Sequence, residues 1–379
     1  MKYPELLDLY TDFLATSPNI VSAGLLSDVL NNEHSHDRIT RMLAQNALDQ
    51  KQYWQIVKPT IRKIEKADGV ISIDDTISEK PYSTENELIS WHFDHTKGCS
   101  VKGINIVTFT YVNPDFAQTV KAPVAFETVI KDSTQTKTIK KNGKFVTRTT
   151  PCASITKNQL VQTRLKALVY QNHVLFRYVS FDTWFSSADN INFIVNDLKK
   201  QVVCAVKDNR TITFDTKKSK KEQQWTQVSK LDIEPNKAYY VKLKDIDFEV
   251  LLVKKVYHNL GGSVGVQYLI CTDTNLNAEQ ISDIYKQRWS SEDSHRSLKQ
   301  NTALEKMPAK TQNAQMNHVF ASMVAQMKLE CLKIATQKNH YQLKRAILVH
   351  ALKTAWEQIN LLKQQCLKNN IHLPNFCTA

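Results

Sequence analysis

The change in hydrophobic period along the chain constrains the fold more than any other feature of the sequence. From Gly69 onward, runs of β-branched and aromatic residues alternate with segments that have helical spacing. The strand-like runs cover residues 70–75, 104–112, 120–130, 174–182 and 202–207. A helix-like segment at residues 157–170 separates the first three runs from the fourth. Three consecutive strands followed by strand–helix alternation predict an α/β fold with a mixed sheet flanked by helices.

Residues 1–68 have the apolar spacing of helices and predict a helical N-terminal domain. Two amphipathic stretches, residues 21–30 and 39–48, flank a polar turn. Such a pair can form a helix-turn-helix in which Arg38 and Arg41 reach DNA. A helical pair that serves only for packing fits the same pattern, so both interpretations stay open.

Two further changes of pattern follow the alternating region. A lysine cluster leads into three strand-like runs that predict a β-rich insertion, and from residue 314 the pattern is helical. The sequence therefore predicts five segments: a helical N-terminal DNA-binding domain, the first part of a core, the β-rich insertion, the second part of the core and a helical C-terminal region. Their bounds are residues 1–68, 69–208, 209–274, 275–312 and 313–379.

The charge of the chain indicates a polyanionic partner. Fifty Lys and Arg against 37 Asp and Glu give a net charge of +13, which suits nucleic acid better than an acidic surface would. Residues 301–379 contain ten Lys and Arg but three acids, so seven of the thirteen net charges lie there. We therefore expect the C-terminal region to face DNA.

Cysteine usage and hydropathy predict a cytoplasmic protein. The seven cysteines include no CxxC pair and are odd in number, which argues against a disulfide framework and against a zinc ribbon. No apolar run approaches the ~20 residues of a membrane span. Residues 1–16 lack the charged start and apolar core of a secretory signal. We expect no membrane partner.

Residues 281–300 have the length of one helix and carry four polar side chains on one stripe. At 100° per residue, offsets of three, seven and fourteen residues fall within about 60° of one another. The four are Tyr285, Arg288, Glu292 and Lys299. Metal-assisted phosphoryl transfer needs such a set, because the acid holds a divalent ion while the cations hold the nucleic-acid backbone. A solvated helix face with an i,i+4 Arg–Glu pair explains the same pattern.

Two aspartates elsewhere in the chain can complete such a site. Asp75 ends the first apolar strand and Asp182 ends a later one. A two-metal site gathers carboxylates from distant segments, so both are natural partners for Glu292. Asp at a strand end also starts turns, which is the alternative for either residue taken alone. Asp189 is a poorer rival to Asp182, because helix capping explains it.

The polar stripe resembles the signature of a known family. The spacing Tyr285-x2-Arg288-x3-Glu292-x6-Lys299, with Trp289 after the arginine, is similar to the Y-R-E-K signature of the bacterial insertion-sequence transposases of family four. These enzymes belong to the DDE transposases.

The resemblance extends beyond this helix. It covers Asp74-Asp75-Thr76 on the first strand, Asp182 before an aromatic residue, and a β-rich insertion between the second acid and the glutamate. It spans roughly residues 71–299. The helical N-terminal domain is similar in kind.

This resemblance implies an RNase H-like catalytic core. Asp75, Asp182 and Glu292 would hold two Mg²⁺ ions, with Mn²⁺ as a substitute, one activating water or a 3′ hydroxyl and the other stabilising the leaving oxygen. The tyrosine, arginine and lysine of the signature would grip phosphates near the transposon end, where arginine and lysine do different work.

The resemblance also implies an activity and its partners. It predicts a DNA transposase that binds the terminal inverted repeats of its insertion sequence and moves it by cut and paste. The partners would be double-stranded DNA, as transposon ends and as target, and a second copy of the chain in the active complex. We expect it in the bacterial cytoplasm, associated with the nucleoid. A catalytically silent DNA-binding protein and an RNase H-like nuclease remain alternatives.

The first metal-binding position has two candidates. Asp74 competes with Asp75, and we favour Asp75 because period-two alternation places it on the face of Ile71 and Ile73, opposite Asp74. The family acid, by resemblance, also immediately precedes a threonine, as Asp75 does.

Three other features stay open. Trp289 can stack on an extruded base, but a place in the core is the favoured interpretation. Trp225 in the insertion is another stacking candidate. The segment with His92, Asp94 and His95 suggests no fourth zinc ligand and has no helix or finger spacing, so its role is not predicted.

Overall fold

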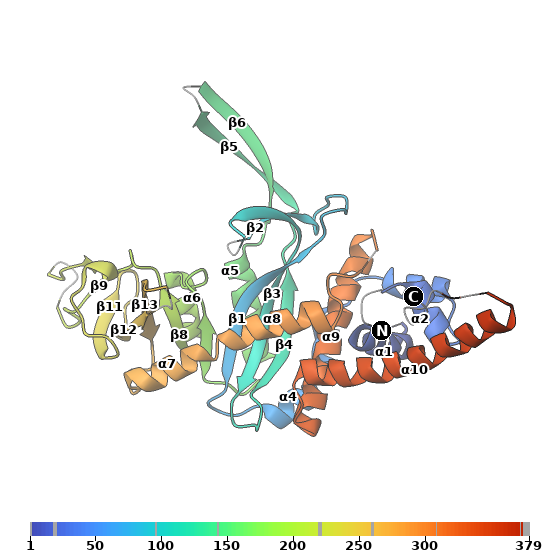
Figure 1. The fold of residues 1–379 in the computed structure, drawn as a ribbon. Helices are drawn as coiled ribbons and strands as arrows, with labels where there is room; N and C mark the ends of the chain where they lie inside the picture. Colours follow the sequence, from blue (N-terminus) through green and yellow to red (C-terminus); the bar gives the residue numbers. More distant parts are fainter. Residues whose placement is uncertain are drawn as a thin grey trace.

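The computed structural model shows a mixed α/β protein built around one large sheet (Figure 1). It describes residues 2–17, 21–94, 97–141, 144–218, 222–258, 261–307, 309–371 and 373. Within these ranges the sheet has eleven strands in the order β10-β9-β11-β12-β13-β8-β7-β1-β3-β2, with β4 paired to β3. The predicted class, a mixed sheet flanked by helices, is confirmed.

The centre of the sheet is formed by six strands. They are β1 (Val70–Glu79), β2 (Ser90–Asp94), β3 (Cys99–Asn113), β4 (Val120–Thr128), β7 (Tyr178–Phe181) and β8 (Gln201–Val206). β1 pairs antiparallel with β3 and parallel with β7, and β7 pairs parallel with β8. β1 is longer than the predicted run because Thr76, Ile77 and Ser78 still pair with β3. Asp75 therefore lies in mid-strand and not at a strand end.

Helices cover both faces of this central sheet. α5 (Lys157–Tyr170) is the last element before β7 in the long connection that returns the chain to pair parallel with β1. Ser72 of β1 accepts a hydrogen bond from Ser291 of α8 (Trp289–Asn301) at 2.8 Å. Lys157 of α5 instead contacts Asp75, whose side chain points to the other face of the strand. After β7 follow α6 (Ala188–Asn192) and a π-helical turn (Phe193–Asp197).

The predicted single helix at residues 281–300 is two helices. α7 (Ala278–Lys286) ends before α8 begins. Between them the amides of Gln287 and Arg288 bond to carbonyls three residues back, and not four. This 3₁₀-type turn changes the angular offset across it. The polar stripe therefore does not keep uniform helical spacing.

The β-rich insertion continues the central sheet from one edge. Its strands are β9 (Thr211–Thr213), β10 (Thr226–Gln227), β11 (Ala238–Leu243), β12 (Val250–His258) and β13 (Val264–Cys271). A short 3₁₀ turn (Val228–Lys230) follows β10. β13 pairs antiparallel with β8, so the inserted strands extend the same sheet (Figure 1).

The N-terminal and C-terminal helices pack together. The N-terminal helices are α1 (Pro4–Thr16), α2 (Ala23–Val29), α3 (His36–Leu43) and α4 (Gln50–Ile64), and the C-terminal ones are α9 (Gln312–Thr336) and α10 (His340–Lys368). α9 is buried along most of its length. Its Asn317 donates to the Leu43 carbonyl at 2.9 Å and accepts from the Leu48 amide at 2.8 Å. The helical character predicted for both ends is present, and the five segment bounds remain a prediction.

Two strands stand apart from the large sheet. β5 (Ser133–Lys141) and β6 (Lys144–Cys152) pair only with each other among the described strands. This regular hairpin was not predicted from the sequence. Among the helices of the described ranges, none combines the length and the apolar content that a bilayer span requires.

Candidate active site

A polar cavity of about 390 Å³ lies where the centre of the sheet meets α8. Five carboxylates border it: Asp74, Asp75, Asp94, Asp182 and Glu292. They come from β1, the end of β2, the residue after β7, and α8. The three predicted catalytic acids are therefore among the residues that the fold brings to one cavity.

The two aspartates of β1 point to opposite faces of the strand. Asp74 lies on the α8 face, where its Oδ2 is 3.9 Å from Nη1 of Arg288. Asp75 lies on the α5 face, where its Oδ2 accepts hydrogen bonds from Lys157 Nζ and Asn105 Nδ2, both at 2.7 Å. Asp75 is thus already neutralised by a lysine. Asp74 shares its face with the helix that carries Glu292.

Asp182 lies beside Asp74. The β1–β7 register pairs Ile73 with Phe181, so the next residue of each strand, Asp74 and Asp182, comes to the same level of the sheet. The Trp184 amide donates to Asp182 Oδ1 at 2.9 Å and fixes the carboxylate. Burial raises the pKa of Asp182.

Asp74 is the most perturbed acid of the cavity. Burial, followed by the charges of Asp182 and Asp75, raises the pKa of Asp74 to about 7, although Arg288 opposes the change. Carboxylates that repel one another in this way are held close together by the fold. A strongly perturbed acid in a cleft is typical of functional sites.

Arg288 links Glu292 to β1. Its Nη2 donates to Glu292 Oε1 at 2.9 Å, which is the i,i+4 pair of the alternative interpretation. The guanidinium also lies 5.6 Å from the ring centres of Tyr285 and Trp289. Because it faces Asp74 as well, this arginine belongs to the cavity and is not a solvated surface charge.

The other residues of the predicted DNA grip differ in exposure. Tyr285 is 5% exposed, accepts a hydrogen bond from Gln267 at 3.3 Å, and is not among the residues that line the cavity. Lys299 lines the cavity, with Nζ 3.3 Å from Glu305 Oε1. Trp289 is 59% exposed, so the favoured core interpretation was wrong. Its ring is open to a substrate.

Arg38 and Arg41 lie outside the cavity. Both are exposed on α3, which Ser35 caps by accepting from the Arg38 amide at 3.4 Å. Arg41 Nε donates to the Asp37 carbonyl at 3.3 Å. Their contact with DNA remains a prediction.

Sequence reasoning missed three side chains of the site. Lys157 and Asn105 hold Asp75, and nothing in the strand pattern indicated either contact. His295 lines the cavity and bonds to Thr108 of β3 at 2.7 Å. Burial lowers the pKa of His295 to about 4, so the ring is neutral. Its position three residues after Glu292 is the helical offset that could have found it.

The segment after β2 is only partly described. His92 bonds to Ser90 at 3.0 Å, and burial, with the charges of Lys131 and Lys157, lowers the pKa of His92 to about 4. Asp94 borders the cavity. His95 lies outside the described residues.

The carboxylates fit a divalent cation by their chemistry. Carboxylate oxygens are the ligands that Mg²⁺ prefers, and a cation would offset the burial and the carboxylate repulsion that together raise the pKa of Asp74. Within the described residues, no three side chains of the metal-ligating types already enclose a cation position. Arg288 and Lys157 balance the acids instead, so a metal that binds here must displace part of these ion pairs.

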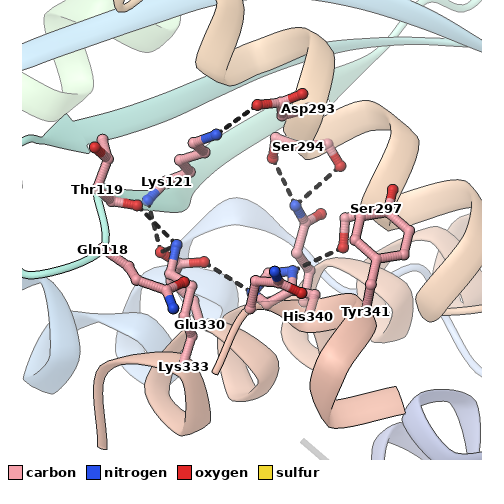
Figure 2. Close-up of a pocket in the computed structure, with 12 residues that line it drawn as sticks. Gln118, Thr119, Lys121, Asp293, Ser294, Ser297, Glu330, Lys333, His340 and Tyr341 are labelled. Carbon is pink, nitrogen blue, oxygen red and sulfur yellow. Dashed lines mark hydrogen bonds and ion pairs between the residues drawn. The ribbon is translucent and has the colours of Figure 1, made fainter. Parts of the chain in front are cut away.

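A second polar cluster holds the opposite face of α8. Figure 2 shows Asp293, Ser294 and Ser297 of α8 directed toward α9, α10 and β4. Ser294 Oγ accepts from Gln326, and Ser297 Oγ lies 2.7 Å from His340 Nδ1. These contacts fix the rotation of α8, and therefore the direction in which Glu292 points.

Glu330 is the centre of this second cluster. It is fully buried, and its carboxylate lies 2.5 Å from Lys333 Nζ and 2.9 Å from His340 Nε2 (Figure 2). It also accepts from the Lys121 amide at 2.6 Å. Burial alone would raise the pKa of Glu330, but these partners hold it below its usual value. The glutamate therefore stays ionised.

Comparison with known families agrees with this geometry. A model of the DDE superfamily endonucleases matches residues 5–230, more than half of the chain. The chain belongs to the DDE superfamily endonucleases. A second model, of the transposase DDE domain, matches residues 140–327. No curated protein matches the chain. The segment of this DDE endonuclease that contains Asp182 and Glu292 is therefore similar to a transposase DDE domain.

Proposed function

We propose that the chain is a DNA transposase that binds the terminal inverted repeats of its insertion sequence and moves it by cut and paste. The observation that carries the proposal is the convergence of acids from β1, the end of β7 and α8 on one cavity that Arg288 and Lys299 also line. Membership of the DDE endonucleases gives this arrangement its chemistry. We also propose that the chain is a transposase of the family-four type, as the resemblance of its Tyr285, Arg288, Glu292 and Lys299 spacing implies.

In this proposal the metal-holding acids are Asp182, Glu292 and an aspartate of β1. The sequence favoured Asp75. The contacts favour Asp74, because it faces α8 and lies level with Asp182, whereas Asp75 is bound by Lys157 and Asn105. We assign the metal to Asp74 and a supporting role to Asp75.

The cofactor in this proposal is a pair of Mg²⁺ ions, for which Mn²⁺ can substitute. When bound, such ions neutralise charge on the phosphate and lower the pKa of water. The side chains of the protein would supply the ligands of these ions and the charge around them. Asp74, Asp182 and Glu292 provide the oxygens, and neutral His295 adds no competing charge beside them.

The cations and aromatics of the site would hold the DNA end. The Lys299 ammonium lines the cavity and can pair with a phosphate. The planar Arg288 guanidinium, which now bonds to Glu292, can instead donate two hydrogen bonds to a phosphate. Tyr285 backs the guanidinium, and Trp289 presents an open ring on which a base can stack. Arg38 and Arg41 of α3 would bind the repeat sequence.

The active unit in this proposal is a homodimer that holds two transposon ends, associated with the nucleoid. Its test uses the DNA that flanks the gene, which should carry imperfect inverted repeats. Purified protein with Mg²⁺ should cleave at these ends, and Glu292→Gln should bind the same DNA without cleaving it. The amide removes a metal ligand but leaves Arg288 and Lys299 in place. Binding by the wild type without any cleavage would refute the enzyme and favour a silent DNA-binding protein.

A further inference from the structure

Strands β5 and β6 form a ribbon that projects from the body of the molecule, here named the hairpin arm (Ser133–Lys141 and Lys144–Cys152). Each strand has nine residues, paired without a break from Ser133 with Cys152 to Lys141 with Lys144. Figure 1 shows the arm extending away from the large sheet. At about 3.3 Å per residue, it reaches about 30 Å.

Most of the described side chains of the arm are open to solvent. Every side chain that the structure describes between residues 133 and 149 is exposed. Two pairs of threonine hydroxyls cross the ribbon, Thr136 with Thr149 at 3.0 Å and Thr138 with Thr147 at 3.3 Å. A two-stranded ribbon is only marginally stable by itself in water. Contact with a partner would stabilise it.

The composition of the arm favours a negatively charged partner. Residues 133–152 contain five Lys and Arg and no Asp or Glu, which is five of the thirteen net positive charges of the chain. They also contain six threonines, whose hydroxyls donate hydrogen bonds to phosphate oxygens. The complementary surface is a polyanion.

Residues at the base of the arm contact residues that border the candidate active site. Asp132 accepts hydrogen bonds from the amide and the hydroxyl of Ser154 at 2.8 and 2.6 Å, which closes the base of the ribbon. Three residues later, Lys157 binds Asp75 of the cavity. On the other side of the root, Lys131 donates to the carbonyl of Trp91 in β2, the strand whose last residues border the cavity.

We propose that the hairpin arm binds duplex DNA alongside the active site. This inference rests on the proposed function, because it takes the DNA held at the cavity to continue along the arm. A two-stranded ribbon fits the major groove of B-DNA, which is about 12 Å wide. The net positive charge of the arm and its threonine hydroxyls complement the phosphates on either side of the groove.

The test compares two variants that lose equal charge. The arm variant changes the five cations of the arm to glutamine: Lys137, Lys140, Lys141, Lys144 and Arg148. The control variant changes five exposed lysines around the inserted strands to glutamine: Lys207, Lys217, Lys230, Lys237 and Lys244. Binding of each to a duplex with the terminal repeat is measured over a series of salt concentrations.

The arm variant should bind at least about tenfold more weakly at 0.1 M salt, and its salt slope should fall by about 2 to 4.5, since each lost phosphate contact contributes about 0.9. The control should lose much less. Equal loss in both variants, or no loss in the arm variant, would overturn the proposal. So would dissociation of a dimer by the arm substitutions in the absence of DNA, which would show that the arm binds a second copy.

Limited proteolysis tests the wild-type protein without any substitution. Trypsin cuts after lysine and arginine, so the arm should be cut first in the free protein, and saturating duplex should slow that cutting. Unchanged cutting would contradict the proposal. Two outcomes separate the arm from the proposed function. If the wild type cleaves DNA and the arm variant still binds DNA normally, only the arm proposal fails. If the wild type binds DNA through the arm but never cleaves it, only the proposed function fails.

Discussion

Replacing Asp74 by asparagine should stabilise the metal-free protein while abolishing cleavage. The side chain is largely buried, and the nearby charges of Asp182 and Asp75 add to the effect of burial. Asparagine keeps the size of the side chain and can still accept from the Asp75 amide, as Asp74 does at 2.9 Å. The substitution therefore removes the unfavourable charge with little other change.

The expected gain depends on pH. Asp74 has a pKa of about 7 in the folded protein, against 3.8 for an ordinary aspartate. Below pH 3.8 the group is protonated in both states and has no effect. As the pH rises to 7, the unfolded chain releases the proton first, so the folded protein loses stability. Above pH 7 the loss is complete and amounts to about 4 kcal/mol as an upper bound.

Urea denaturation with EDTA at pH 5 and pH 8 measures this effect. Asp74→Asn should gain about 2 to 4 kcal/mol over the wild type at pH 8, and clearly less at pH 5. Asp75→Asn is the matched control. It removes the ion pair with Lys157 and should cost about 1 to 3 kcal/mol. A gain that is absent at pH 8, or equal at both pH values, would refute the reasoning, as would Mg²⁺-dependent cleavage by Asp74→Asn.

Three further substitutions test the supports of the site. Glu330→Ala should lower the free energy of unfolding by about 3 to 5 kcal/mol in denaturant titrations, because it leaves buried Lys333 without its carboxylate partner; a loss below about 1 kcal/mol would contradict this role. Trp289→Ala should change stability by less than about 0.5 kcal/mol but weaken binding of a DNA end by about 1 to 3 kcal/mol in fluorescence titrations, and a large loss of stability would return Trp289 to the core. Lys299→Gln should lower the salt slope of DNA binding by about 1, and an unchanged slope would exclude a phosphate contact.

The sequence predicted the sheet well because its strands are continuous apolar runs. β7 ends at Phe181, next to Asp182, close to where the pattern placed the strand end. The pattern could not predict that β1 continues to Glu79, because polar residues beyond Asp75 pair with β3 only in the folded sheet. Asn142-Gly143, between runs rich in threonine, is a strong hairpin signal that the sequence-based prediction overlooked.

The choice between Asp74 and Asp75 shows where sequence reasoning stops. Alternation correctly placed them on opposite faces, but which face meets α8 depends on tertiary packing. The contacts of Ser72 with α8 and of Lys157 with Asp75 show which face of β1 meets α8, and both contacts join residues far apart in the chain. Helical spacing also grouped Tyr285 with Lys299, although the turn at Arg288 separates the buried Tyr285 ring from the half-buried Lys299 that lines the cavity.

The central claim is that these acids cut DNA at the ends of an insertion sequence. Its most direct test maps, to the nucleotide, the cuts that the purified protein makes with Mg²⁺ in a duplex spanning one terminal repeat and its flank. We predict cuts at the junction of repeat and flank that disappear with EDTA and in Glu292→Gln. Cuts that persist in Glu292→Gln, or an intact junction in both Mg²⁺ and Mn²⁺, would contradict the account.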